Sequence, residues 1–173
     1  MILQSNSGQA KPVVIFAIGN PSRGDDALGP LLLDRLAAWL DEQGLATQFD
    51  LIEDFQLQIE HALDLQDREI ALFIDAGEQT PGPFRFYPVV AASGALHTTH
   101  QLPPAAVLQV YALTETSPAP PAFTLCIRGE SFELGADLSP IAEQNLDSAF
   151  SFLKKLLLAP DAKAWAVAAK DGI

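Results

Sequence analysis

Residues 13–18 read V-V-I-F-A-I and are followed at once by G-N-P at residues 19–21. A short apolar run that stops at turn-forming residues is typical of a strand buried on both faces of a sheet. After the turn, residues 26–43 carry leucine and tryptophan at spacings of three and four, which predicts a helix with one buried face. A buried strand followed by an amphipathic helix indicates an α/β fold.

The same alternation continues along the chain. Residues 84–90 alternate apolar and polar side chains, so we expect a half-exposed edge strand in antiparallel orientation. Together the segments predict a three-layer α/β sandwich, with a mainly parallel twisted sheet and helices on both faces. The other expected strands are residues 49–53, 69–76 and 122–128, and the other expected helices are residues 59–65, 103–113 and 139–158.

The chain of 173 residues has the length of one domain and shows no internal repeat or linker, so residues 1–173 are expected to form a single domain. The polar residues 1–11 and the alanine-rich residues 160–173 are expected to be peripheral. The start lacks an apolar stretch typical of a signal peptide, and no apolar run is long enough to span a bilayer. We therefore expect a cytoplasmic protein without a membrane partner.

The chain is acidic, with 10 Lys and Arg against 22 Asp and Glu and a formal net charge of −12. Such a charge repels nucleic acid and anionic membranes, which argues against both as partners, and it is also common for solubility alone. The single cysteine, Cys126, excludes an internal disulfide and a multi-cysteine metal cage. Because Cys126 lies in an apolar run, we expect a small buried residue rather than a nucleophile.

Polar residues follow the ends of the predicted strands. In an open parallel sheet these ends lie along one edge, where ligands bind. Carboxylates and imidazoles gathered there would suit a metal site or a hydrolytic site. They are Asp25 and Asp26 after the first strand, Asp54 after the second, Asp75 after the third, and His97 and His100 after the fourth.

Each of these residues also has a structural interpretation. Asp25 or Asp26 could cap the next helix, and Asp75 could hydrogen-bond a turn. His61, in the expected helix at residues 59–65, is interpreted as an ordinary surface or half-buried histidine. No phosphate-binding glycine motif, G-x-S-x-G or H-E-x-x-H sequence is present. From the residues alone, the result is an α/β domain with an acidic, histidine-bearing rim.

Four motifs nevertheless resemble one family. In order and spacing over residues 13–157, the chain is similar to the hydrogenase maturation proteases, endopeptidases that trim the C-terminal tail from the large-subunit precursor of nickel–iron hydrogenases. The first motif is the most specific of the four. The motifs are A-I-G-N-P-S-R-G-D-D-A-L-G-P from residue 17, E-D-F-Q-L-Q-I-E-H-A-L-D-L from residue 53, F-I-D-A from residue 73 and T-H-Q-L from residue 99.

The resemblance implies a site and a mechanism. It implies that Asp26, Asp75 and His100 bind metal, that Asp26 or Asp75 acts in catalysis as a general base, and that Asp54 is the family's loop acid. The metal would be nickel supplied by the substrate's large subunit and not retained by the isolated enzyme. The partner would be that precursor, cleaved by water after nickel insertion, and the protein itself is expected to be a monomer.

Two other functions remain open at this point. A non-enzymatic nickel-sensing or partner-docking module would use the same three residues without cleaving a substrate. Peptidyl-tRNA hydrolases also have a strand followed by G-N-P, although the net charge of −12 argues against a tRNA substrate.

Overall fold

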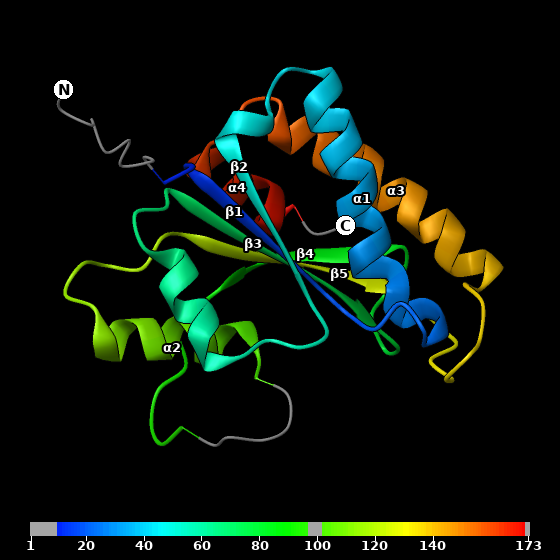
Figure 1. The fold of residues 1–173 in the computed structure, drawn as a ribbon, viewed down its shortest axis with the longest axis horizontal. Helices are drawn as coiled ribbons and strands as arrows, with labels where there is room; N and C mark the ends of the chain where they lie inside the picture. Colours follow the sequence, from blue (N-terminus) through cyan, green and yellow to red (C-terminus); the bar gives the residue numbers. More distant parts are fainter. Residues whose placement is uncertain (1–9, 97–101, 172–173) are drawn as a thin grey trace, which may run out of the picture.

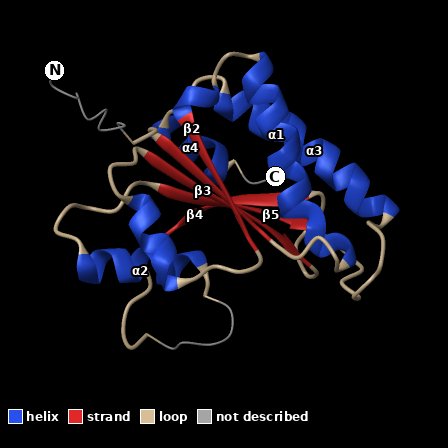
Figure 2. Cartoon of the chain, viewed as in Figure 1, coloured by secondary structure: helices blue, strands red, loops and turns tan. Residues whose placement is uncertain are grey.

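The computed structural model describes residues 10–96 and 102–171, which form a mixed sheet with helices on both of its faces (Figures 1 and 2). The strands are β1 Val13–Ile18, β2 Phe49–Asp54, β3 Ile70–Gly77, β4 Phe84–Val89 and β5 Ala122–Arg128. The α-helices are α1 Leu28–Glu42, α2 Pro104–Thr114, α3 Pro140–Leu157 and α4 Ala162–Lys170. The 3₁₀ helices are η1 Gly24–Ala27, η2 Ala46–Gln48 and η3 Ile59–Leu65.

The five strands lie in the order β2-β1-β3-β5-β4. Neighbouring strands are parallel except for β4, which runs antiparallel to β5 at one edge of the sheet. The expected α/β class, the mainly parallel sheet and the antiparallel edge strand are therefore confirmed. Because β1, β3 and β5 are parallel and adjacent, their carboxyl ends open onto the same edge of the sheet.

Two apolar layers enclose the sheet. On one face, alternate strand residues such as Val13 and Ile15 pack against α1, α3 and α4. On the other face, Val14 and Phe16 pack with η3 and α2. Figure 1 shows α1 and α3 on one side of the strands and α2 on the opposite side. All six residues of β1 are buried, as its uninterrupted apolar run predicted.

The helices follow the apolar spacing of the sequence. In α1, buried leucines recur every four residues at Leu28, Leu32, Leu36 and Leu40, so one stripe of the helix faces the sheet. The chain leaves this helix at Gly44, whose φ of +68° is costly for other residues. None of the helices within the described ranges combines the length and apolar character needed to cross a bilayer.

Helix α4 corrects the expectation that residues 160–173 are peripheral. Its Trp165 is fully buried, with ring centroids 5.6 Å from Phe123 and 6.2 Å from Phe86. The Trp165 indole N–H donates to the carbonyl of Leu156 at 3.3 Å. The small alanines around this tryptophan let the helix approach the sheet closely. One large apolar residue among alanines does not reveal from sequence where it packs.

Candidate active site

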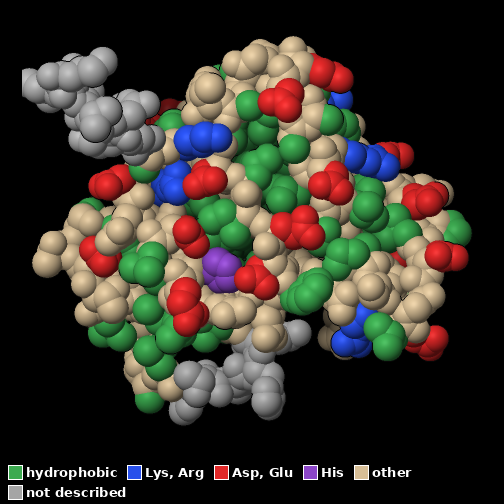
Figure 3. Space-filling model, in the orientation of Figure 1, with side chains coloured by type: hydrophobic (Ala, Val, Ile, Leu, Met, Phe, Trp, Pro, Cys, Tyr) green, Lys and Arg blue, Asp and Glu red, His purple; other side chains and the backbone are tan. Residues whose placement is uncertain are grey.

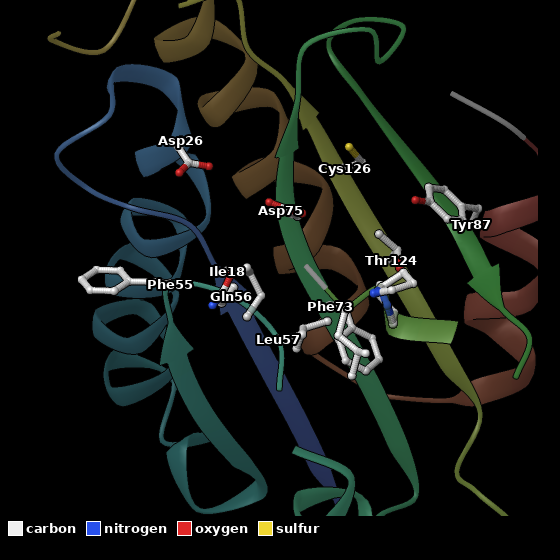
Figure 4. A pocket seen from close by; sticks show the side chains of 13 residues that line it. Ile18, Asp26, Phe55, Gln56, Leu57, Phe73, Asp75, Tyr87, Thr124 and Cys126 are labelled. Carbon is white, nitrogen blue, oxygen red and sulfur yellow. The ribbon is translucent and has the colours of Figure 1, made fainter. Parts of the chain in front are cut away.

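A cavity of about 430 Å³ lies at the carboxyl ends of the strands (Figure 4). Asp26 reaches it from η1 and Asp75 from β3, so the structure brings together two of the three residues expected to form the site. The remaining walls come from the segment after β2, the face of the sheet that packs against η3 and α2, and the start of α2. They include Phe55, Gln56, Leu57, Tyr87, Thr124, Cys126 and Pro104.

The G-N-P turn fixes the position of Asp26. The backbone N–H of Asn20 donates to Asp26 Oδ2 at 2.9 Å, which holds the half-buried carboxylate over the end of β1. Gly19 has a φ of +149°, and a Cβ at this position would overlap the carbonyl oxygen of Asp26. A glycine is therefore required here for both its backbone conformation and the close approach of the next loop.

Gly19→Ala tests this arrangement. The new methyl group must push the Asp26 backbone away, so we expect a loss of about 2–3 kcal/mol in the free energy of unfolding. Denaturant unfolding measures that loss. Gly44→Ala, at a positive φ where the Cβ would meet no atom, should cost only about 1 kcal/mol. Equal losses in the two variants would show that the overlap with Asp26 is unimportant.

Asp75 is the group in the cavity with a strongly altered acidity. Its carboxylate lies where protein walls replace part of the surrounding water, although the side chain remains accessible from the cavity. This desolvation raises the pKa of Asp75 to about 6; the backbone N–H of Ala76 opposes the rise and the charge of Asp26 adds to it. A carboxyl group with such a pKa can accept and release a proton near neutral pH.

Asp25 has a different role from the one expected. Neither η1 nor α1 has a side-chain cap, so the helix-capping interpretation of Asp25 or Asp26 is wrong. The fully buried Asp25 carboxylate instead accepts hydrogen bonds from the segment between β5 and α3. The donors are the N–H groups of Glu130 at 2.7 Å, Ser131 at 3.0 Å and Ser139 at 2.7 Å, and the Ser139 hydroxyl at 2.7 Å.

Asp54 and His61 support one wall of the cavity. His61 is buried, which corrects the expectation of a surface or half-buried residue. Its Nδ1 accepts the N–H of Gln58 at 2.8 Å, and its Nε2 lies 3.4 Å from Asp54 Oδ2. Asp54 also accepts the N–H of Phe55 at 2.7 Å. These contacts hold the segment between β2 and η3, which carries the wall residue Phe55.

Cys126 and Thr124 are cavity residues that the sequence reasoning missed. Cys126 is half-buried rather than buried, and its Sγ lies 3.0 Å from the Thr80 hydroxyl. Burial raises the pKa of the Cys126 thiol, so it does not resemble an activated nucleophile. Cys126 pairs with Asp75 across the sheet, and Thr124 points to the same face because it lies two residues away on β5. The signal that would have found these two residues is the register between β3 and β5, which an apolar run does not reveal.

The third expected ligand, His100, and the other rim histidine, His97, lie outside the described residues. Within the described part of the chain, no group of three or more His, Cys, Asp or Glu side chains could hold a metal ion. Asp26 and Asp75 are thus the two members of the predicted ligand set that the structure describes.

Comparison with known proteins gives a consistent fold. No protein-family model and no curated protein sequence matches the chain. Among solved structures, it is similar to the NiFe hydrogenase maturation protease HycI from Thermococcus kodakarensis KOD1, with 22% identity, 89% of this chain and 96% of that chain covered, and a TM-score of 0.61. It is also similar to the hydrogenase maturating endopeptidase HybD from E. coli, with 19% identity, 83% of this chain and 91% of that chain covered, and a TM-score of 0.62. A third similar structure is the NiFe hydrogenase maturation protease HybD from Thermococcus kodakarensis, with 21% identity, 84% of this chain and 98% of that chain covered, and a TM-score of 0.59.

Proposed function

We propose that this chain, whose fold is that of the hydrogenase maturation proteases, is an endopeptidase that removes the C-terminal extension of a nickel–iron hydrogenase large-subunit precursor. The observation that carries the proposal is the meeting of Asp26 and Asp75 in one cavity at the carboxyl ends of the strands. The fold likeness extends over 89% of the chain in one comparison and supports the same substrate class. The four sequence motifs support it independently.

Nickel enters this proposal as part of the substrate. It would reach the cavity already bound to the large subunit, and Asp26, Asp75 and His100 would be its ligands on this chain. Two carboxylates and one imidazole suit a divalent first-row metal ion, although they do not select nickel over zinc. When bound, such an ion polarises a carbonyl group or lowers the pKa of water. Recognition of this ion would restrict cleavage to precursors that have received their metal.

Asp75 is the better candidate for the general base. In the metal-free site, its pKa of about 6 leaves it largely ionised at neutral pH and able to accept a proton from an attacking water molecule. The water oxygen bonds to the scissile carbonyl carbon, the carbon–nitrogen bond breaks, and Asp75 returns the proton to the leaving amine. Asp26, held by Asn20, provides the second negative charge and a ligand position.

Processing of a precursor tests the proposal. Purified protein is incubated with a large-subunit precursor from the same source, either loaded with nickel or free of it, and the products are weighed by intact mass spectrometry. We expect loss of one C-terminal peptide from the loaded form only. Unchanged mass in both forms, with a precursor that its authentic machinery can process, would contradict the peptidase. Tight retention of nickel by the isolated protein in that case would favour the nickel-sensing module.

The remaining expectations concern the cellular setting. Monomeric state, cytoplasmic location and the absence of nucleic-acid and membrane partners stay predictions from sequence. The predictions about nucleic acid and membranes rest on the net charge of −12. The acidic side chains spread over the face shown in Figure 3 agree with that charge.

A further inference from the structure

A second cavity, of about 390 Å³, continues the first toward the edge of the sheet. The two cavities share Tyr87 and Cys126 in their walls, so they adjoin, and together they are called the groove below. Figure 4 shows Cys126 on β5 beyond Asp75 and Tyr87 farther along on β4. The proposed peptidase chemistry uses the first cavity and assigns nothing to the second. The second is lined by Gly77, Gln79, Thr80, Pro81, Arg85, Tyr87 and Cys126.

Arg85 lies level with Asp75 across the sheet. Cys126 pairs with Asp75 on one side and with Arg85 on the other, so the three side chains form a row on one face of three adjacent strands. Strands are about 4.8 Å apart, which places Arg85 about 10 Å from Asp75 measured along the row. An extended peptide advances about 3.3 Å per residue and would cover this distance with about three residues.

The charge at this end of the groove is the opposite of that at the Asp75 end. Arg85 is exposed, and its guanidinium carbon lies 5.8 Å from the centroid of the Tyr87 ring. It forms no salt bridge with any residue in the described ranges, and it is the single cationic side chain that those ranges contribute to the two cavities. A guanidinium group held against an aromatic ring has its planar donors free for a carboxylate.

We propose that the second cavity binds the peptide released from the precursor, and that Arg85 pairs with a carboxylate about three residues beyond the scissile bond. This inference rests on the proposed function. The carboxylate is either an acidic side chain of the tail or its terminal carboxyl group. Arg85 is then a specificity-determining residue for the sequence or length of the tail.

The direction of the substrate follows from the two ends of the groove. Arg85 lies on β4, the edge strand, where a flexible tail can leave the sheet without meeting another strand. At the other end, Phe55 follows β2 at the opposite edge, and 67% of its surface is exposed although it belongs to the cavity wall. An exposed aromatic side chain suits contact with the folded body of a large subunit. The tail therefore lies on the Arg85 side.

Two measurements test the role of Arg85. The first is kcat/KM for nickel-loaded precursors whose tails carry glutamate or glutamine at the third residue after the scissile bond. We expect Arg85→Gln to reduce kcat/KM for the glutamate tail about tenfold, mainly through KM, and to leave the glutamine tail unchanged. Arg85→Glu should recover activity on a tail with lysine at that position. Arg35→Gln, which removes an exposed arginine from α1, should have no effect.

A separate arm identifies the source of the carboxylate. Five glycines added to the end of the tail move the terminal carboxyl group out of reach while the side chains stay in place. If Arg85→Gln still reduces kcat/KM for the glutamine tail but no longer does so when the five glycines are added, the terminal carboxyl group is the ligand. Equal kcat/KM for wild type and Arg85→Gln on every tail would overturn the inference.

The second measurement does not depend on turnover. Binding of the synthetic tail peptide to the purified protein is followed by calorimetry, for wild type, Arg85→Gln and Arg35→Gln. Weaker binding to Arg85→Gln alone supports the peptide site even if the precursor is not cleaved, an outcome that would count against the proposed peptidase only. Cleavage with equal peptide binding by all three proteins would refute the Arg85 site and leave the peptidase standing.

Discussion

Asp75→Asn will give a folded protein that processes the nickel-loaded precursor at least about 1,000-fold more slowly than wild type. The amide has nearly the shape of the carboxyl group, but it carries no charge and cannot accept the proton of the attacking water. It also removes one of two carboxylates that would face the metal of the substrate. Single-turnover cleavage, followed by intact mass, measures the loss directly.

The same substitution should slightly stabilise the protein at neutral pH. The pKa of Asp75 is raised to about 6 in the folded state, so folding favours its protonated form. Wild type therefore loses stability as the pH rises from the unfolded value of 3.8 to about 6, and the asparagine variant does not. Because solvent enters the cavity and screens the charge, we expect a gain on the order of 1 kcal/mol at pH 7.

Glu78→Gln is the matched control for Asp75→Asn. Glu78 is an exposed acid on the turn that follows β3, so its loss should change neither cleavage nor stability. Normal processing by Asp75→Asn would remove Asp75 from the catalytic site. Slow processing by both variants would instead attribute the effect to the negative charge of the region.

Asp25→Ala will destabilise the protein by about 3–5 kcal/mol, because it removes a buried carboxylate and leaves three N–H groups and one hydroxyl without their acceptor. For a chain of this length the midpoint of thermal unfolding should fall by about 10 °C. Ser139→Ala, which removes only the hydroxyl donor and its weak cap on α3, should cost about 1 kcal/mol. Similar losses in both variants would contradict the central position of the Asp25 carboxylate.

The pH dependence of the Asp25→Ala effect provides a second readout. Burial raises the pKa of the Asp25 carboxyl, but the hydrogen bonds from Glu130, Ser139 and Ser131 outweigh burial and hold this pKa below 3.8. The stabilisation is therefore fully present above the unfolded value of 3.8 and is lost as the pH falls through the lower folded value. Urea unfolding should show a constant difference between wild type and Asp25→Ala from pH 7 to about 4, and a smaller one below.

Much of the fold could be predicted because the pattern of apolar and polar residues along the chain indicates which strand faces are buried. The run V-V-I-F-A-I marks a strand buried on both faces, and the alternation of residues 84–90 marks the edge strand. Because parallel strands end at the same edge of a sheet, the sequence predicts that Asp26 and Asp75 lie there together, and the structure places them in one cavity. This part of the prediction needed only topology.

The missed features depend on contacts between distant segments. The acceptor role of Asp25 requires donors from the segment after β5, and nothing near Asp25 in sequence indicates them. The packing of Trp165 depends on aromatic partners from β4 and β5. Cys126 reaches the cavity because of the register between β3 and β5, which an apolar run leaves undetermined.

The hydrogen bonds to Asp25 also determine when the site can assemble. Their donors lie 105 to 114 residues later in the chain, so the loop that carries Asp26 is tied down only after β5 and the start of α3 have formed. Contacts over such separations form late, since closing a long loop has a large entropic cost. During synthesis, β1, β2 and β3 leave the ribosome before these donors exist. A nascent chain ending before Glu130 thus contains both carboxylates without the hydrogen bonds that anchor the loop of Asp26. Under the proposed function, proteolytic activity would then mark completed folding.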